Sequence, residues 1–552
     1  MTMSRLRKGK TAFRRQRKAG FVLLAVLAFI TSIVTLTGTS TTRSLAERSR
    51  VTQYVAKQES FYAAEAGIIQ GMATVRDRLS ITGQFPVASP SGLLTVATPQ
   101  LTQGATFENF QVTYDVDGNG VADPATQTTL ASGQFQGMQA TSRTVKVTSE
   151  VSTISGMRTH LTSVMTLSVI PVFQFAMFDH NDLKLEPLPL MTVSGAVFSN
   201  GALKLLPVTG MTIDGTVGAA GDITHPGNNT GYVRVKDADG VYQNMRNADG
   251  SWLESTDSNW AAESQTRWDG KVTAHMAPLQ FPVPAGAETI EMIKQGQTGD
   301  STEMRNMRMY YKADIRIMNG VATDKNGNLI SLPAGTISTA TFYDQREGDE
   351  ACTTQVDVGK LKDSGLANGK IVYVGSTLAN GPSCFNAVRL VNGGQLPSGG
   401  LTVVTHHPLY VKGDYNYSTS GEYTKQPAAL VGDALTVLSS GWDDAKGTSP
   451  MVSRKAVDTH LYAGVMAGRA QDPTTGSEHL VRFLETWTGR TFTFTGSEVS
   501  PWESDEASSD LSYASYMPPT RVWSFDTSFI TGTPPPGTPV TYTLTNAAWY
   551  QE

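Results

Sequence analysis

The feature that most limits how this chain can fold is an uncharged, largely apolar segment close to its N-terminus. Residues 19–42 form a run of 24 positions without a charged side chain. A helix rises about 1.5 Å per residue, so this run is long enough to cross a hydrocarbon core of roughly 30 Å. Basic residues that flank a span keep that end in the cytoplasm, so the rest of the chain is expected on the opposite side. The eight basic residues before Gly20 are Arg5, Arg7, Lys8, Lys10, Arg14, Arg15, Arg17 and Lys18.

The charge of the chain is unevenly distributed around this segment. The full sequence has 44 basic and 49 acidic residues, and its formal net charge is −5. Without residues 1–20, 36 basic residues remain against 49 acidic ones, which gives a formal charge of −13. A protein body this acidic is not a general binder of polyanions, so contact with nucleic acid would need a local basic patch.

An amphipathic pattern continues directly from the apolar segment. Between Leu45 and Val75 the apolar side chains recur at intervals of three and four residues, which is the stripe of an amphipathic helix. No proline occurs between residues 21 and 85. We therefore expect one continuous helix from Phe21 to Leu79, with its first half in a membrane and its second half packed on a soluble domain.

This arrangement resembles the N-terminus of a type IV pilin. A short basic leader ends in Gly20, and the stretch FYAAEAGI at residues 61–68 resembles the helix of PilX-type minor pilins. The resemblance implies that a prepilin peptidase cleaves between Gly20 and Phe21, and that Phe21 becomes the N-methylated first residue. It also implies that the span is retained, first as a single-pass inner-membrane anchor and later among other pilins in a pilus at the cell surface.

One position departs from the pilin pattern. The fifth residue after the expected cleavage point is Ala25, where most pilins carry a glutamate. In the family, that carboxylate neutralises the N-terminal amine of the preceding subunit, a charge that is otherwise costly in apolar surroundings. A subunit without it is expected at the tip, where nothing precedes it; neutral variation at this position is the alternative.

The residues after the helix are typical of a strand-rich protein. Residues 81–172 alternate polar and apolar side chains, which predicts the sheet of a pilin domain. The segments 178–195 and 198–215 then match at a 20-residue offset, with eight identical positions. Repeats of this length with short apolar runs and glycines predict stacked strand rungs. We therefore predict an α+β pilin, with a long N-terminal helix and an antiparallel sheet, that carries a large β-solenoid (a parallel β-helix).

The predicted domain organisation follows from these patterns. The leader is 1–20, the transmembrane and amphipathic helix 21–80, the pilin sheet domain 81–172, the β-solenoid domain 173–500 and the C-terminal segment 501–552. Asx-Gly turns such as the one in DKNGNL predict a mixed β-rich insertion from 226 to 366 within the solenoid. The alternating sequence VTYTLTNAAWYQE follows a proline-rich linker and indicates a strand that returns to the pilin sheet.

A β-solenoid carried on a pilin is similar to a class of competence-associated minor pilins. That resemblance implies a position at or near the tip of a type IV pilus and a role in natural transformation, with extracellular DNA as the ligand. Two alternatives keep the same anchor. One is a pilus-tip adhesin that binds glycans or surfaces, and the other is a K-type pseudopilin of type II secretion, which also lacks the fifth-position glutamate.

Basic and aromatic residues that suit DNA binding interleave in residues 304–320. If this segment is a strand, Lys312 and Arg316 share a face with Tyr310, which combines cations for phosphates with a ring for base stacking. A solvated face paired with nearby acids is the alternative. The candidates in this segment are Arg305, Arg308, Tyr310, Lys312 and Arg316.

Two further lysines are candidates because the repeat brings them together. Lys184 and Lys204 occupy equivalent positions of the two repeats, so they are expected about 5 Å apart on neighbouring strands. Two like charges at that separation repel each other unless an anion lies across them, which makes the pair a second candidate for DNA.

A calcium loop is predicted at residues 115–123. The sequence DVDGNGVAD places oxygen ligands at the first, third, fifth and ninth positions and Gly120 at the sixth, which is EF-loop-like spacing. The twelfth position is Thr126 rather than glutamate, and a hairpin tip is the alternative. The ligands would be Asp115, Asp117, Asn119 and Asp123, and no other cofactor is expected.

The remaining chemistry of the chain is structural. Its two cysteines, Cys352 and Cys384, are predicted to form a disulfide worth about 3–4 kcal/mol on the loop-entropy model, with two buried thiols as the alternative. An exported protein meets the oxidising conditions that a disulfide requires. No catalytic motif is present, so an enzyme is not expected. The pair His406–His407 lies in a strand-like run and is predicted to serve packing or a turn.

Overall fold

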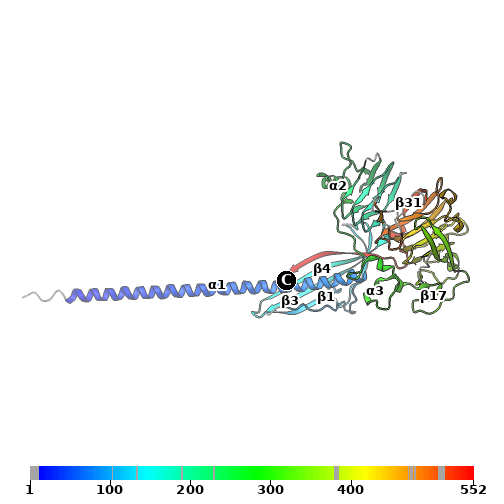
Figure 1. Ribbon diagram of the computed structural model, residues 1–552. Helices are drawn as coiled ribbons and strands as arrows, with labels where there is room; N and C mark the ends of the chain where they lie inside the picture. The colour runs from blue at the N-terminus through cyan, green and yellow to red at the C-terminus, as the bar shows by residue number, and fades with distance from the viewer. Residues whose placement is uncertain are drawn as a thin grey trace, which may run out of the picture.

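A single long helix and several many-stranded sheets make up the chain. The computed structural model describes residues 12–101, 104–131, 135–187, 190–227, 231–377, 384–469, 471–472, 476–477, 480–507 and 516–551, so residues 1–11 of the predicted leader lie outside it. Helix α1, Ala12–Thr82, is continuous over 71 residues and projects as a rod from the rest of the molecule (Figure 1). The predicted unbroken helix from Phe21 to Leu79 is confirmed.

An antiparallel sheet lies along the C-terminal half of α1. Its strands are ordered β1-β3-β4-β32, and the short strand β2 also pairs with β3. Strand β32 pairs with β4 along almost its whole length, so the C-terminal segment returns to this sheet and ends beside α1 (Figure 1). The bounds are β1 Ala105–Thr113, β2 Thr126–Thr129, β3 Gln139–Thr153, β4 Arg158–Pro171 and β32 Val540–Gln551.

The helix packs on this sheet through its apolar stripe. Ala64, Ile68, Val75 and Leu79 are buried against apolar side chains of the sheet. The close approach depends on a glycine, because a Cβ on Gly71 would lie only 2.7 Å from the Val147 Cγ1 of β3. A long helix on an antiparallel sheet, joined to further sheets, is a pilin-like α+β architecture.

The sequence repeat forms three ladders of parallel strands. Partners lie 20 residues apart, so Leu183 pairs with Leu203 and Lys184 with Lys204. The rings of Phe178 and Phe198 stack with their centroids 6.4 Å apart. The first ladder holds β5 Phe175–Asp179, β8 Ala196–Ser199, β11 Val217–Ala219 and β15 Val272–Thr273; the second holds β6 Leu183–Leu185, β9 Leu203–Leu205 and β12 Ile223–Thr224; the third holds β7 Met191–Ser194, β10 Gly210–Asp214 and β13 Tyr232–Lys236, extended by β14 Tyr242–Asn244.

A second group of parallel strands continues from the first ladder. Strand β30 pairs with β5, which makes one long sheet in the order β15-β11-β8-β5-β30-β26-β24-β22-β20-β16-β17. A facing sheet has the order β18-β19-β21-β23-β25-β29. The new bounds are β16 Ile315–Met318, β17 Val321–Asp324, β18 Ile337–Asp344, β19 Asp349–Asp357, β20 Lys370–Gly375, β21 Cys384–Val391, β22 Leu401–Val404, β23 Leu409–Lys412, β24 Ala428–Gly432, β25 Leu435–Leu438, β26 Thr459–Ala467, β29 Val481–Phe483, β30 Thr491–Ser500 and β31 Thr520–Phe525, which also pairs with β30.

The range 226–366, predicted as an insertion, takes part in these sheets. Strand β13 pairs in parallel with β10, and β16 pairs in parallel with β20. The range is therefore joined to strands that precede it (β10) and follow it (β20), and its interpretation as an insertion stays a prediction. As described, each of the larger sheets has two open ends and does not close on itself.

Short helices fill the connections between the strands. The most relevant are α3 Thr302–Met307 and α4 Met309–Lys312, which follow each other directly. Helix α3 contacts the C-terminal part of α1 at the base of the stacked strands (Figure 1). The others are α2 Trp260–Trp268, α5 Val358–Asp363 and α6 Ser528–Thr531.

Candidate functional site

The first candidate is the half of α1 that contacts no other part of the chain. From residue 20 to residue 55 every side chain is exposed, and the first buried one is Ala56. Phe21 is 77% exposed and Leu36 is 74% exposed, whereas Val75 is fully buried. The most apolar window of this helix has a mean hydropathy of 2.4, so it has the length and composition of a membrane span. Such a surface requires lipid or other protein around it.

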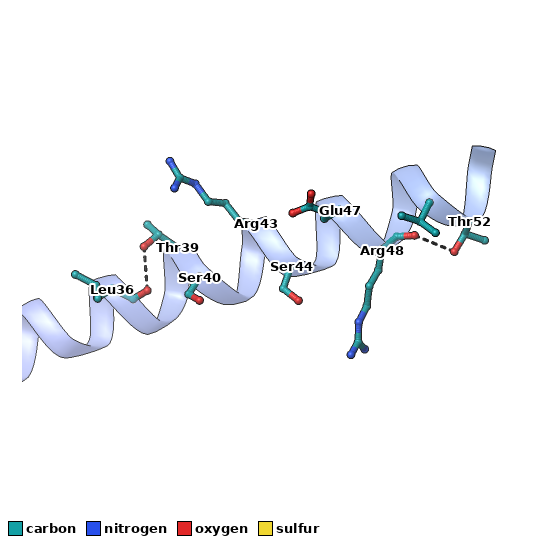
Figure 2. A pocket seen from close by; sticks show the side chains of 9 residues that line it. Leu36, Thr39, Ser40, Arg43, Ser44, Glu47, Arg48 and Thr52 are labelled. Carbon is teal, nitrogen blue, oxygen red and sulfur yellow. Dashed lines mark hydrogen bonds between the residues drawn. The ribbon is translucent and has the colours of Figure 1, made fainter. Parts of the chain in front are cut away.

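Hydroxyl groups near the end of the span are satisfied within the helix itself. Figure 2 shows the Thr39 hydroxyl bonded to the Leu36 carbonyl and the Thr52 hydroxyl bonded to the Arg48 carbonyl, at 3.0 and 2.9 Å. Because these groups bond to the preceding turn, threonines there can tolerate an apolar environment. The side chains of Arg43 and Arg48 extend away from the helix in the same view, and Arg43 is the first charge after Lys18.

The shallow hollow drawn in Figure 2 belongs to this helix alone. All of its lining residues lie between Leu36 and Thr52. A hollow bordered by one helix cannot enclose a small ligand, so it is part of the open flank of α1.

The residues of the predicted cleavage point are accessible. Gly20 and Phe21 both lie within α1 and are exposed, and a Cβ on Gly20 would meet nothing within 4 Å. Ala25 is exposed one turn further on. These positions therefore make no contact that would oppose cleavage or assembly.

The predicted DNA-binding strand at residues 304–320 is not one strand. The segment forms α3, α4 and β16 in succession, so Tyr310 and Lys312 lie on a helical turn and Arg316 on a strand. The expected common face does not form. The reason is local, since Ser301 caps α3 by accepting a hydrogen bond from the Met304 N–H, which favours a helix start over an extended chain.

Arg308 is a buried structural residue. Its side chain is 4% exposed and lies between two carboxylates, 2.5 Å from Glu291 and 2.8 Å from Asp300. Burial by itself raises the pKa of Asp300, but hydrogen bonds from the Gln297 N–H and the Tyr311 hydroxyl, together with the Arg308 charge, lower it overall. Arg308 is therefore committed to internal ion pairs, and DNA phosphate cannot reach it without breaking them.

Arg316 and Tyr310 are also committed to internal contacts. The Arg316 guanidinium lies 4.6 Å from the centroid of the Tyr310 ring and donates to the Tyr310 carbonyl at 2.8 Å. The Tyr310 ring also packs edge to face with the Tyr373 ring. Arg305 and Lys312 remain exposed, with Arg305 over the Tyr311 ring at 5.3 Å.

The stacked lysines of the repeat are neutralised by carboxylates. Lys184 lies 2.8 Å from Glu186, and Lys204 lies 2.7 Å from Asp182. The expectation that an external anion bridges the two lysines is therefore not needed to explain their close spacing. Both counterions come from the first repeat, because Glu186 follows Lys184 in the sequence and Asp182 reaches Lys204 across the paired strands.

The acidic loop at residues 115–123 folds around its own backbone. Asp115 accepts hydrogen bonds from the N–H groups of Gly118, Asn119 and Gly120, and Asp123 accepts from the Val116 N–H. Asp117 bonds to Asn119. Among the described residues, the acids of this loop do not bring their oxygens close enough to form a metal-binding group. Strands β1 and β2, which flank the loop, each pair with β3 and not with each other, so the loop is not the tip of a β1–β2 hairpin, and the calcium site stays a prediction.

The two cysteines are bonded to each other. Cys352 on β19 and Cys384 on β21 form a disulfide between neighbouring parallel strands. The bond joins two strands of the sheet that faces the long sheet, so its role is structural.

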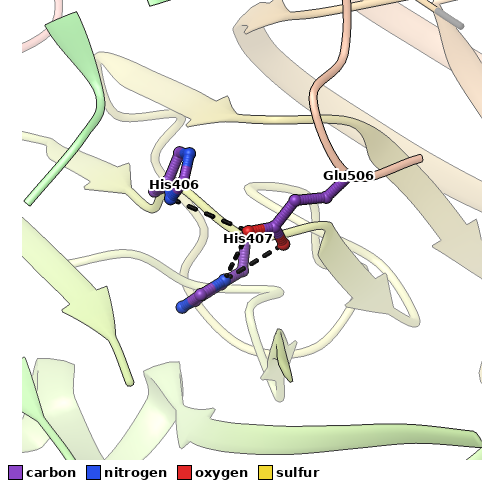
Figure 3. A group of neighbouring side chains, drawn as sticks. All are labelled: His406, His407 and Glu506. Atoms are coloured by element: carbon purple, nitrogen blue, oxygen red, sulfur yellow. Dashed lines mark hydrogen bonds and ion pairs between the residues drawn. The ribbon is translucent and has the colours of Figure 1, made fainter. Parts of the chain in front are cut away.

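A cluster that the sequence did not predict contains His406, His407 and Glu506. Each residue offers a ligand atom, and these atoms lie within 4.8 Å of one another (Figure 3). Burial lowers the pKa of His406. Burial would also lower the pKa of His407, but the hydrogen bond and charge of Glu506 raise it. The adjacent histidines were the visible signal, whereas Glu506 lies 99 residues away and only the fold brings it near.

The helix and its sheet define the class of the molecule. A long N-terminal helix with an uncovered apolar half and a second half packed on an antiparallel sheet is the plan of a pilin-like protein with a candidate single-pass membrane anchor. No protein-family model matches the sequence, and no curated protein is significantly similar to it.

One solved structure aligns along most of the chain. It is the crystal structure of the competence-associated pilin ComZ from Thermus thermophilus, with 12% sequence identity and a TM-score of 0.26. The alignment covers 90% of this chain and 97% of that one. Because a TM-score this low does not establish a common fold, the pilin-like character of this chain rests on its own helix and sheet.

Proposed function

We propose that this chain is a minor pilin at or near the tip of a type IV pilus, and that it binds extracellular DNA for natural transformation. The observation that carries the proposal is the division of α1. Residues 20–55 are exposed and largely apolar, while the continuation of the same helix packs on the antiparallel sheet. That sheet carries the part of the chain between Pro171 and Val540, here called the head. A membrane anchor that later packs among other pilin helices requires such an uncovered apolar surface.

Two features support a position at the tip, and a third concerns processing. The head is much larger than the sheet that packs on α1, so neighbouring heads along a filament would crowd one another (Figure 1). Ala25 supplies no carboxylate for the amine of a preceding subunit. The resemblance of the Gly20–Phe21 junction to prepilin cleavage sites supports processing by a prepilin peptidase.

The proposed head is a β-solenoid. The support is the parallel pairing of the repeats at their 20-residue offset and its continuation through β30 into a second set of parallel strands. Stacked rungs of this kind build a long, rigid surface. Limited proteolysis of the purified chain tests the idea, since a single solenoid should resist cleavage at the connections throughout residues 173–500.

Fewer of the predicted DNA-binding residues are available to contact DNA. Arg305 and Lys312 are exposed and lie on either side of Tyr311 in the sequence, and the Arg305 guanidinium lies over the Tyr311 ring. Because the exported body is strongly acidic, affinity would depend on such a local patch.

A DNA titration of the full-length chain in detergent, at two salt concentrations, tests the ligand. DNA binding predicts an affinity that falls steeply with salt, and the double change Arg305→Ala with Lys312→Ala reduces the salt slope by about 2. The matched control is Lys455→Ala with Arg490→Ala, which removes two exposed cations elsewhere on the head. Salt-independent binding, or none, contradicts the DNA role.

The alternatives have their own readouts. Glycan-array binding without DNA binding would favour the adhesin. A deletion strain that still transforms but no longer secretes proteins would favour the pseudopilin. Immunogold labelling of the head tests the position directly, since labels at pilus ends support the tip and labels along the shaft contradict it.

A further inference from the structure

We propose that His406, His407 and Glu506 form a binding site for one zinc ion. This inference is independent of the pilus function, because it rests only on side chains of the head. Imidazole nitrogens and a carboxylate oxygen are ligands that zinc prefers, and two histidines with one glutamate is a known donor set for it. Calcium takes oxygen ligands almost exclusively, so two imidazoles select against it.

The three residues come from two segments that are held in place independently. His406 and His407 lie in the turn between β22 and β23, where the His407 N–H donates to the Thr405 hydroxyl at 3.1 Å. Glu506 follows β30, and its N–H donates to Asp433 at 3.2 Å. Each side of the site is therefore positioned by hydrogen bonds other than those between the proposed ligands.

Asp433 is the main organiser of the Glu506 side. Its carboxylate accepts from the Asp505 N–H at 2.7 Å and from the Ser504 hydroxyl. Asp433 is itself fully buried at the end of β24. A buried carboxylate that binds successive N–H groups fixes the direction in which the Glu506 side chain leaves the backbone.

The distances between the proposed ligand atoms suit a tetrahedral ion. Measured to the same oxygen, Glu506 Oε1, His407 Nδ1 lies at 3.2 Å and His406 Nδ1 lies at 3.7 Å. With zinc–nitrogen and zinc–oxygen bonds of about 2.0–2.2 Å, ligand atoms at the corners of a tetrahedron are about 3.3–3.6 Å apart. Figure 3 shows both rings directed toward the same carboxylate.

The outer nitrogen of His407 has the partner that a metal ligand usually has. In one tautomer its Nε2 donates to the Ser376 carbonyl at 3.2 Å, and in the other it accepts from the Ser376 N–H at 3.3 Å. When Nε2 carries the proton, Nδ1 presents its lone pair toward Glu506. Histidines that bind metals commonly donate their other N–H to a backbone carbonyl, which fixes the tautomer.

Within the described part of the chain, the His406 ring lacks such a partner for its outer nitrogen. Its Nε2 is buried and has no hydrogen-bond partner, and the nearest carboxylate oxygen, on Asp505, is 4.0 Å away. Asp505 is already paired with Lys294 at 3.2 Å, so it is not a fourth ligand. Three protein ligands leave the fourth position of zinc for water.

The rival interpretation is a metal-free ion pair between His407 and Glu506. It explains the 3.1 Å contact, but it gives His406 no reason to face the same carboxylate. The two interpretations differ in the effect of changing His406, which is essential to a three-ligand site and dispensable to the pair.

Zinc titration of the full-length chain, purified in detergent without a histidine tag and stripped with a chelator, tests the proposal. We expect one zinc ion per chain by calorimetry and by elemental analysis after desalting. His406→Gln and Glu506→Gln should each weaken binding more than about 100-fold, because losing even an outer-shell partner costs 10–100-fold. His460→Gln is the matched control, since His460 forms a similar pair with Asp414 at 3.1 Å and, among the described residues, has no third ligand group beside it; it should leave binding unchanged.

A second measurement uses only the wild-type chain, so it tests the proposal even if the variants fail to fold. Cobalt added to the stripped wild-type chain should give the visible absorption of a tetrahedral site and should be displaced by zinc but not by calcium. Zinc should also raise the Tm of the wild-type chain. Failure of the wild-type chain to bind one zinc, or equal zinc affinity in wild type and His406→Gln, overturns the proposal. Neither result bears on the pilus function, which the DNA titration and immunogold labelling test separately.

Discussion

The two halves of α1 belong to one unbroken helix but differ in every respect that concerns packing. Side chains from residue 20 to residue 55 are all exposed, whereas the later half buries an apolar stripe against the antiparallel sheet. The glycines show the difference most clearly. A Cβ on Gly38 would meet nothing within 4 Å, while a Cβ on Gly71 would lie 2.7 Å from Val147.

This contrast teaches that helix continuity and helix environment are set separately. The absence of proline and the helical spacing of apolar residues keep the rod intact through both halves. The distribution of apolar side chains determines what surrounds each half. A helix that is apolar on all sides needs lipid or partner helices, and a helix with one apolar stripe needs a sheet. Three changes can break or sharpen the comparison.

The largest effect is expected from charges in the exposed half. Leu27→Asp with Ile33→Asp should oppose membrane insertion by about 5–7 kcal/mol, since each central aspartate costs about 2.5–3.5 kcal/mol. Alkaline extraction of membranes measures the loss, and Leu27→Ala with Ile33→Ala is the control that keeps the segment apolar. The Tm of the detergent-solubilised head should not change. A lower Tm would mean that the exposed half also packs on the head.

The next largest effect is expected at the close approach of helix and sheet. Gly71→Leu should destabilise the fold by about 1–3 kcal/mol or more, because the added side chain must displace β3. Denaturant unfolding measures the change in free energy. Gly38→Leu is the matched control in the other half of the same helix and should leave unfolding unaffected. If the two changes lower the free energy of unfolding equally, the two halves of α1 do not differ in packing.

The smallest effect is expected at the boundary between the halves. Ser60 and Thr159 are buried, and their hydroxyls are hydrogen-bonded at 2.7 Å. Ser60→Ala should cost about 1–3 kcal/mol, because it leaves the Thr159 hydroxyl buried without its partner. Adding Thr159→Val should recover most of that loss. If the double variant is as unstable as the single one, the hydrogen bond is not what holds the boundary.

The parts of the fold that the sequence predicted are those set by local periodicity. The helix of α1 follows from spacing and the absence of proline, and the parallel pairing of Leu183 with Leu203 follows from the 20-residue repeat. The strand VTYTLTNAAWYQE alternates in the sequence and lies beside β4 in the structure. In each case a pattern within one short segment determines the element.

The candidate sites were harder to predict, because the sequence pattern does not show which side chains form hydrogen bonds and ion pairs with one another. Arg308 looked like a DNA contact, but a capped helix turns it inward between Glu291 and Asp300. The histidine pair looked like packing, because Glu506 comes from a distant segment. Charge and spacing indicate which residues are capable of binding, and only the fold determines which of them are already occupied.

The pairing of β32 with β4 also determines how the head is attached. The chain enters the head after Pro171 and leaves it before Val540, and these two residues are register partners in the same sheet. The head is therefore a loop with both ends fastened to the sheet that packs on α1. A pull on the head reaches the helix through two backbone connections side by side, so the load is shared and a nick within the head would not release it from the rod.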